Sequence, residues 1–412
     1  MKPLLIVSCL IVWANVAAAT ETDFRLSSQW QWQHGDIIAS PDNNPNNTIF
    51  NLAEDTVTVE LKPTFDLNWQ QFSLQVDPRF HYLARENDNN LGSESSEANL
   101  RYVKLEYQQN QVSAAIGKYV QLWGPSVIFS PSNRYHNDNG RTDPSSELLA
   151  REFVEADWFI NDHWDLQLVA NVGEGDQEPE NFKRSGDLRL SWLGNAVTTT
   201  LQTSWMNPGW GVGGLAQWTV NDGLLVYADG LYAPFQTVDN YLESLNNLNN
   251  EVDIKPNQRR LKLVSGLSYT FANGTTFALD YYYNGTGLSG NKSTDKLRAS
   301  INAVSQLLQG NTDPNLSEQV RQLNTLPFFN LSNRYTVARL SHSELLDKLS
   351  ASFIVINNLA DHSHQDILSI DCECTNSMSV YLTASHFHGD SLTEFGRFYS
   401  NQFSLGLRWV MY

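Results

Sequence analysis

The sequence predicts an all-β fold: a transmembrane, antiparallel up-and-down β-barrel of about 18 strands, within roughly 16 to 18, with short periplasmic turns and long extracellular loops. Apolar and polar residues alternate along stretches long enough to cross a bilayer, because successive side chains of a strand point to opposite faces. Aromatic residues stand at the ends of the apolar faces, and very short turns alternate with long polar loops. A soluble sandwich also alternates, but this combination is typical of a membrane barrel.

Residues 1–19 are predicted to be a signal peptide, and residues 20–412 the barrel. Lys2 is followed by an apolar run from Pro3 to Val16 and by small residues ending at Ala19, where cleavage is expected. This run is too short for a spanning helix, and no later stretch approaches the roughly 20 apolar residues that one requires. We therefore expect an exported protein of the cell outer membrane of a Gram-negative bacterium.

The hairpin between Thr56 and Tyr82 shows the strand pattern most clearly. Every second residue from Val57 to Trp69 is apolar, the residues between them are polar, and the alternation resumes after the turn Gln70–Gln71. One face is therefore apolar and the other polar and charged. The other strands are expected, in order, at Asp23–Gln33, Tyr102–Gln108, Gln111–Tyr119, Val154–Ile160, Trp164–Asn171, Asp187–Leu193, Val197–Trp205, Gly211–Val220, Leu224–Phe235, Arg259–Phe271, Thr275–Asn284, Arg334–Leu340, Leu349–Leu359, Ile367–Cys374, Met378–His386 and Gln402–Tyr412.

The connections between strands differ in length and chemistry. Asn273–Gly274 is a strong hairpin turn signal. Long loops are expected at roughly Asn87–Glu97, Gln121–Ala150 and Gly285–Asn333, and the last of these contains a predicted amphipathic helix at Asp295–Gln309. Such a helix is suited to folding over or into a pore.

The net charge of −18 argues against a nucleic-acid partner, which calls for a basic face. The strands carry roughly equal numbers of basic and acidic residues, so the acidic surplus lies in the loops, where it would attract the divalent cations that bridge lipopolysaccharide phosphates. Charges on the polar strand faces predict a water-filled lumen, because a charge facing lipid costs about 2 to 4 kcal/mol at mid-depth. The predicted lumen charges are Lys62, Arg79, Arg101, Lys104, Glu106, Lys118, Arg151, Asp157, Arg189 and Lys262. Tyr102, Phe159 and Tyr282 are predicted lumen aromatics that would stack on sugar rings.

One stretch interrupts the alternation. It runs from Gly117 through Trp123, Gly124 and Pro125, and continues as Phe129-Ser130-Pro131-Ser132-Asn133-Arg134. This resembles the strand end and following Asn/Pro loop of Gram-negative barrels in the alginate-export and porin-like group, and its Trp-Gly-Pro is similar to the outer-membrane lectin that anchors capsule. In porin-like relatives this loop folds inward and narrows the channel, so the resemblance implies that Lys118, Tyr119, Trp123 and Arg134 lie near a constriction. An alginate conduit has an Arg-rich lumen, whereas this wall is balanced in charge. The alternative is a strand-end bend with Trp123 in the interface belt.

Four histidines near the C-terminus form a candidate metal site. A turn centred on Asn376 would place His364 opposite His388 and Asp366 opposite His386, with His362 and Asp390 one step further out. Imidazole and carboxylate ligands suit Zn²⁺ or Cu²⁺. The alternative is a group of solvated loop histidines without a metal.

Two cysteines remain after the leader. Cys372 and Cys374 share one strand face, with Cα atoms about 6.5 to 7 Å apart in an extended strand, at the edge of bridging distance. We expect thiols in the apolar wall, and a disulfide is the alternative.

The final strand places Phe403, Leu405, Leu407 and Trp409 on one face and ends at Tyr412. This resembles the terminal signal that outer-membrane barrels present to the barrel-assembly machinery. The other expected partners are outer-membrane lipid and lipopolysaccharide, and both a monomer and a homo-oligomer stay open.

The function that these patterns favour is passive diffusion of small polar solutes or oligosaccharides through a porin-like channel. No nucleophile motif, P-loop or zinc-ligand helix is present, so neither catalysis nor a cofactor is expected. The alternatives are a plugged barrel that binds or anchors surface polysaccharide, and a polysaccharide exporter of the alginate-export type.

Overall fold

The computed structural model describes residues 21–38, 44–47, 51–86, 92–136, 148–173, 175–177, 180–182, 184–206, 209–235, 258–289, 295 and 330–411. The predicted leader, the predicted helix beyond Asp295, and Tyr412 lie outside these residues. Within the described part of the chain, no helix is long and apolar enough to cross a membrane.

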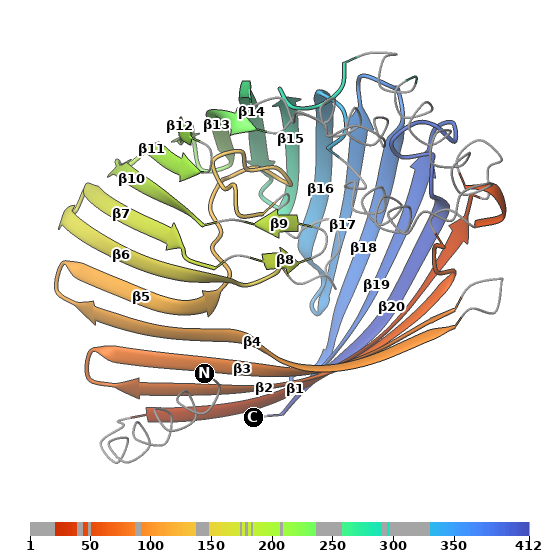
Figure 1. The fold of residues 1–412 in the computed structure, drawn as a ribbon, viewed down its shortest axis with the longest axis horizontal. Coiled ribbons are helices and arrows are strands. Elements are labelled where there is room, and N and C mark those ends of the chain that lie inside the picture. The colour runs from red at the N-terminus through yellow and green to blue at the C-terminus, as the bar shows by residue number, and fades with distance from the viewer. Residues whose placement is uncertain are drawn as a thin grey trace, which may run out of the picture.

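Eighteen antiparallel strands form one closed barrel, in which each strand pairs with its neighbours in the chain and β20 pairs with β1 (Figure 1). This confirms the predicted fold class and strand number. The strands are β1 (Glu21–Ile37), β2 (Asp55–Trp69), β3 (Phe72–Glu86), β4 (Ser93–Gln109), β5 (Val112–Tyr119), β6 (Arg151–Asn161), β7 (Trp164–Asn171), β10 (Ser185–Leu193), β11 (Val197–Met206), β12 (Gly209–Thr219), β13 (Leu224–Phe235), β14 (Gln258–Thr270), β15 (Thr275–Asn284), β16 (Arg334–Leu346), β17 (Leu349–Asn358), β18 (His364–Thr375), β19 (Met378–His388) and β20 (Tyr399–Met411).

The two ends of the barrel differ in their connections. Turns of a few residues close one end, which we call the short-turn end, and the longer connections lie at the other. β1 begins and β20 ends at the short-turn end, where Glu21 lies opposite Asn68 and Met411 opposite Leu26. The longer connections carry a 3-10 helix, η2 (Pro45–Asn47), between β1 and β2, and a small antiparallel pair, β8 (Gly175–Gln177) and β9 (Glu180–Phe182), between β7 and β10.

β4 begins earlier than the sequence pattern predicts. Ser93 to Glu97 were expected in a loop but pair with β3, with Ser93 opposite Arg85 and Glu97 opposite His81. This stretch is polar on both faces, so it carries no alternation, and backbone pairing with β3 extends the strand.

Two prolines interrupt the ladder between β2 and β3. The regular pairing stops after Leu61–Phe80 and resumes at Phe65–Val76, so Pro63 and Pro78 lie in the interval. Proline has no N–H to donate to the ladder, which accounts for the gap.

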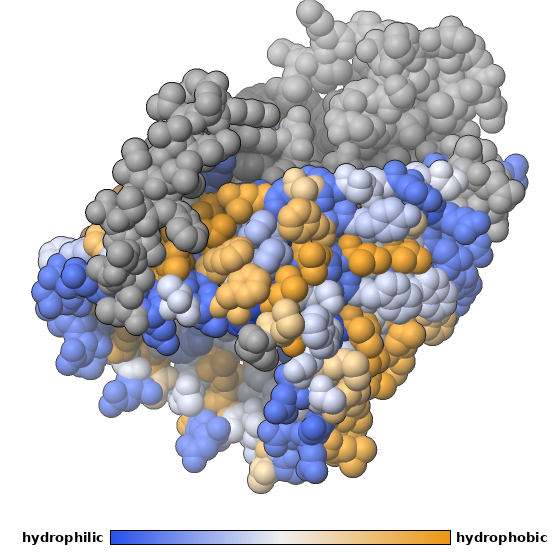
Figure 2. Space-filling model, turned by 90° about the horizontal axis from the view of Figure 1, so that it is seen from below, coloured by the Kyte–Doolittle hydropathy of each residue, from blue (hydrophilic) through white to orange (hydrophobic). Residues whose placement is uncertain are grey.

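The burial of side chains is inverted relative to a soluble domain. On β11, Leu201 is 71% exposed, whereas its neighbour Gln202 is 3% exposed. Large apolar side chains gather in patches on the outer wall (Figure 2). Polar side chains are buried against one another inside, so the alternation in sequence is an alternation between lipid-facing and lumen-facing positions.

Exposed aromatic residues mark both ends of the outer apolar band. Trp164 lies opposite Trp192 near the short-turn end, and Trp205 lies opposite Trp210 near the other end. Indole rings favour the boundary between hydrocarbon and headgroups, and two such girdles are the signature of a transmembrane barrel.

Candidate functional site

The connection that follows β5 folds into the lumen. We call residues 120–136 the constriction segment, and Figure 1 shows it within the ring of strands. Its bend requires glycine at position 124, where φ is +104° and an added Cβ would lie 1.5 Å from Ser130 Oγ. The Ser130 hydroxyl lies 2.8 Å from the Trp123 carbonyl oxygen and closes the bend. The Trp-Gly-Pro motif is therefore explained by backbone geometry.

Apolar side chains fix the tip of the constriction segment to the inner wall. Val127, Ile128 and Phe129 are buried, and the Phe129 ring stacks on Tyr282 of β15 with centroids 4.2 Å apart. Phe395 of the β19–β20 connection also belongs to this cluster, and the inner faces of β13 to β18 supply its remaining buried residues: Tyr227, Val264, Ala278, Tyr335, Val337, Ile354, Ile356 and Ile367. The tip of the segment thus rests on an apolar patch of the inner wall.

Three buried wall carboxylates hold the same segment. Asp229 of β13 accepts hydrogen bonds from the Ser130 hydroxyl at 2.6 Å and from the Ser132 N–H at 2.9 Å. Asp280 of β15 accepts from the Val127 N–H at 2.8 Å. Hydrogen bonds to a charged acceptor are worth about 1.5 to 3 kcal/mol each. The third carboxylate, Asp187 of β10, binds the far end of the segment.

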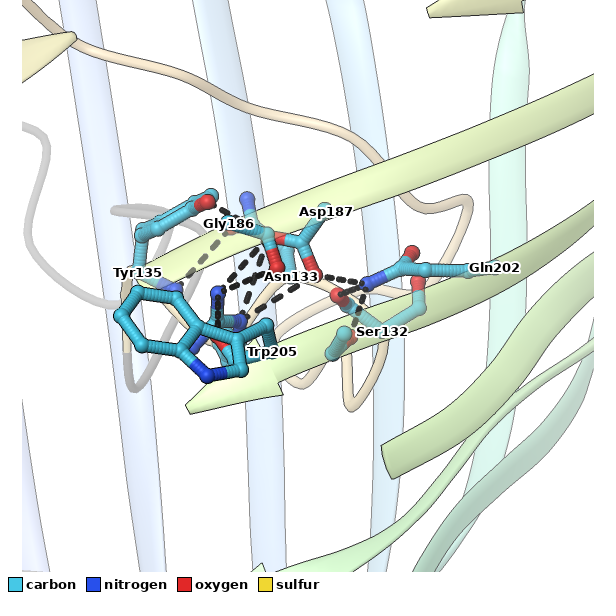
Figure 3. A network of polar contacts seen from close by, with 9 residues as sticks. Ser132, Asn133, Tyr135, Gly186, Asp187, Gln202 and Trp205 are labelled. Carbon is cyan, nitrogen blue, oxygen red and sulfur yellow. Dashed lines mark hydrogen bonds and ion pairs between the residues drawn. The ribbon is translucent and has the colours of Figure 1, made fainter. Parts of the chain in front are cut away.

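The Asp187 network fixes that far end to the wall (Figure 3). Arg134 forms an ion pair with Asp187 at 3.1 Å, and Tyr135 donates its hydroxyl to the same carboxylate. Gln202 donates from Nε2 both to the Ser132 carbonyl and to Asp187, each at 2.9 Å. Burial, followed by the nearby Asp187 charge, raises the pKa of Tyr135 well above its ordinary value, so this phenol stays protonated.

A second set of contacts surrounds Trp123 and Tyr119, where the segment leaves β5. The Arg189 guanidinium lies 4.1 Å from the centroid of the Trp123 ring, a cation–π geometry. Tyr119 donates to Glu155 at 2.8 Å, and Gln121 donates to the same carboxylate at 3.1 Å. These contacts join the constriction segment to β6 and β10.

His136 lies at the end of the segment nearest Arg151. Burial and the Arg151 charge lower the pKa of this imidazole to about 4. His136 is therefore neutral at physiological pH.

A cavity of about 390 Å³ lies on a different part of the inner wall, formed by β20, β1, β2, β3 and β4. Its cations stand beside carboxylates: Lys62 Nζ lies 2.6 Å from Glu60, Arg25 lies 2.8 Å from Asp66, and Asp77 also lines the cavity. A second cavity of about 340 Å³, which shares Gln75 with the first, lies nearer the short-turn end. The first cavity is lined by Arg25, Ser27, Gln29, Lys62, Thr64, Gln75, Asp77, Arg101, Arg408 and Val410.

Most of the predicted lumen charges face inward. Their strand positions alternate with exposed apolar residues, and several are paired, as Lys104 is with Glu106 at 2.8 Å and Arg79 is with Glu60. The residues on the inner face are Lys62, Arg79, Arg101, Lys104, Glu106, Tyr119, Arg151, Asp157, Arg189 and Lys262, while Trp123 and Arg134 lie in the constriction segment.

The prediction that Lys118 lines the lumen near a constriction is wrong. It lies on the outer face with Ile116, which is 55% exposed, and donates from Nζ to the Leu100 carbonyl at 3.0 Å. β5 continues without a register shift through Gly117, so Lys118 keeps the parity of Ile116. It is accommodated there because the end of β5 lies at the rim, where a lysine reaches polar surroundings.

The prediction for Tyr282 is also wrong. It was predicted to offer a stacking surface to a solute, but it is only 3% exposed because Phe129 covers its ring. The buried carboxylates Asp187, Asp229 and Asp280 were missed, since an inward aspartate that binds a loop has the same sequence pattern as one facing water.

The predicted register of the histidines is confirmed: His364 lies opposite His388, and Asp366 opposite His386. His364, Asp366 and His388 bring one ligand atom each to within 4.8 Å of one another. His362, in the turn before β18, and His386 are not part of that group. The cysteines are free thiols with Sγ atoms 3.3 Å apart.

No protein-family model and no curated protein matches the chain. Solved structures share its fold. Pseudomonas aeruginosa OccK5 (OpdH) gives a TM-score of 0.55 at 9% identity, with 96% of this chain and 99% of that chain covered. Pseudomonas aeruginosa OprD gives 0.54 at 11% identity, covering 96% and 97%. Acinetobacter baumannii OccAB1 gives 0.56 at 8% identity, also covering 96% and 97%. These likenesses show that the chain shares the barrel fold of these proteins, and they give no support to the narrower alginate-export resemblance.

Proposed function

We propose that this barrel is a passive, porin-like outer-membrane channel through which small polar solutes or oligosaccharides diffuse. The observation that carries the proposal is the asymmetry of the lumen. The constriction segment is packed against β6, β10, β11 and β13 to β18, whereas the 390 Å³ cavity lies on β20 and β1 to β4. The proposed route passes between the constriction segment and this second part of the wall.

The charge pattern of the lumen lining favours solutes that are polar but carry no large net charge. Arg25, Lys62 and Lys104 each stand within 2.8 Å of a carboxylate oxygen, so opposed charges alternate over short distances. Such a surface binds hydroxyl groups and zwitterions through paired donors and acceptors.

The expected surroundings follow from the outer wall. The leader would be removed after Ala19 before the barrel-assembly machinery inserts the chain, and the apolar band would then contact outer-membrane lipid. The long connections would face outward, beside lipopolysaccharide. The barrel would act as a monomer or as a homo-oligomer.

The polysaccharide alternatives have less support. Their sequence basis is the Trp-Gly-Pro motif, and the +104° φ of Gly124 gives that motif a role in forming a bend.

Conductance of the refolded protein in a planar bilayer tests the proposal, with the reversal potential measured under a salt gradient. We expect stable current steps with weak ion selectivity, and a reduction in current when a permeating oligosaccharide is added. A folded, heat-modifiable barrel that passes no current would overturn the channel and favour the plugged alternative.

A further inference from the structure

We propose that His364, Asp366 and His388 form a transition-metal site, of the kind that binds Zn²⁺, on the outside of the barrel rim. The three residues come from the first residues of β18 and the last of β19. His388 Nε2 lies 3.3 Å from Asp366 Oδ2, and the His364 and His388 rings are stacked with centroids 4.0 Å apart. The site is independent of the proposed channel, because it does not touch the lumen.

The alternation of β18 and β19 places the group outside. Leu368 and Leu382, which share its parity, are exposed on the outer wall, whereas Ile367 is buried inside. The side chains of His388 and Asp366 are 39% and 30% exposed. A metal ion in the surrounding water can therefore reach all three ligands without entering the barrel.

The spacing of the ligand atoms fits a tetrahedral ion. Zinc bonds of about 2.0 to 2.2 Å to nitrogen and oxygen place neighbouring ligand atoms roughly 3.3 Å apart. The His388–Asp366 pair already has this separation, and all three ligand atoms lie within 4.8 Å of one another. Small side-chain rotations of these half-exposed residues would complete three-point coordination and leave a fourth position for water.

A neighbouring contact orients the group. His386 Nδ1 lies 2.6 Å from Asn401 Oδ1 of β20, and the edge of the His386 ring meets the face of His388 at 4.1 Å.

Metal binding would clamp the rim ends of β18 and β19. His388 directly precedes the connection to β20, whose Glu394 N–H donates to Asp361 at 2.8 Å and whose Phe395 N–H donates to Ser363 at 3.3 Å. The clamp would therefore stabilise the point where this connection leaves the wall.

The test is Zn²⁺ titration of the untagged, refolded barrel by calorimetry, in a C372S/C374S background that removes the thiols as competing ligands. We expect one Zn²⁺ per chain, a melting temperature raised by Zn²⁺ and lowered again by EDTA, and a Co²⁺ complex with the visible absorption of tetrahedral coordination. H364Q/H388Q should weaken Zn²⁺ binding at least tenfold and abolish the Co²⁺ absorption.

The matched control is H163Q/H342Q, which changes two histidines at the short-turn end. This variant should bind Zn²⁺ as the parent does. Heat modifiability of each variant on gels shows that the barrel has folded. Equal Zn²⁺ affinity in the H364Q/H388Q variant and its control, or no Zn²⁺ binding by the parent, would overturn the site, and neither result would bear on the channel.

Discussion

Phe129→Ala should release the constriction segment without unfolding the barrel. Phe129 is 1% exposed and stacks on Tyr282 at 4.2 Å. Truncating a buried phenylalanine to alanine costs about 3 to 5 kcal/mol. Since 1.4 kcal/mol corresponds to a factor of ten, the ratio of docked to undocked segment should fall roughly a hundredfold to several thousandfold. The closed ring of strands does not depend on this contact.

The assay is single-channel recording in a planar bilayer. We expect Phe129→Ala to show a larger mean conductance and more open-state noise than the parent, because an undocked segment no longer narrows the lumen in one position. Leu122→Ala is the matched control, since Leu122 lies in the same segment but is 49% exposed. If both variants conducted as the parent does, while Phe129→Ala remained folded on gels, the segment would not control the passage and the reasoning would fail.

Three further predictions concern other parts of the chain. Gly124→Ala should raise open-state noise, because alanine at positive φ costs about 1 to 2 kcal/mol and its Cβ would displace the Ser130 hydroxyl. Burial raises the pKa of Glu394 from 4.5 to about 7, so the folded state binds this proton more tightly than the unfolded state does. The stability that protonated Glu394 contributes should therefore be lost as pH rises from 4.5 through 7. Glu394→Gln should remove this pH dependence from melting temperatures measured between about pH 4 and 8. Cys372 and Cys374 should both be alkylated in the denatured chain without reductant, as measured by mass spectrometry.

Each of these has a contrary outcome. A Gly124→Ala channel as quiet as the parent would show that the bend tolerates a side chain. A melting temperature that rises between pH 4.5 and 7, or the same slope in Glu394→Gln, would mean that another group governs the pH dependence. Two alkyl groups added only after reduction would establish a disulfide between the cysteines.

The sequence pattern predicted more of the wall than of the lumen. Alternation assigned nearly every strand and its faces, because a one-residue shift would expose a whole apolar face to the wrong side. The turn at Asn376 fixed the register of β18 and β19, and with it the pairing of His364 with His388. Lys118 was assigned to the lumen because of its charge. Its position two residues after Ile116, however, already placed it on the outer face. β4 was shortened in the prediction because polar residues on both faces leave no alternation to read.

By itself, the sequence determined the closed, inside-out barrel and the connection that leaves β5 at Trp123 and Gly124, since strand periodicity and turn chemistry are local. Only the tertiary structure decided where that connection rests. Phe129 meets Tyr282, and Ser130 meets Asp229, across separations of about a hundred residues or more in the chain. Closing the barrel brings β13 to β15 opposite the end of β5, and no local pattern distinguishes an aspartate that holds a loop from one that faces water. The shape of the passage is therefore a property of the tertiary structure, because the contacts that hold the segment join residues far apart in the chain.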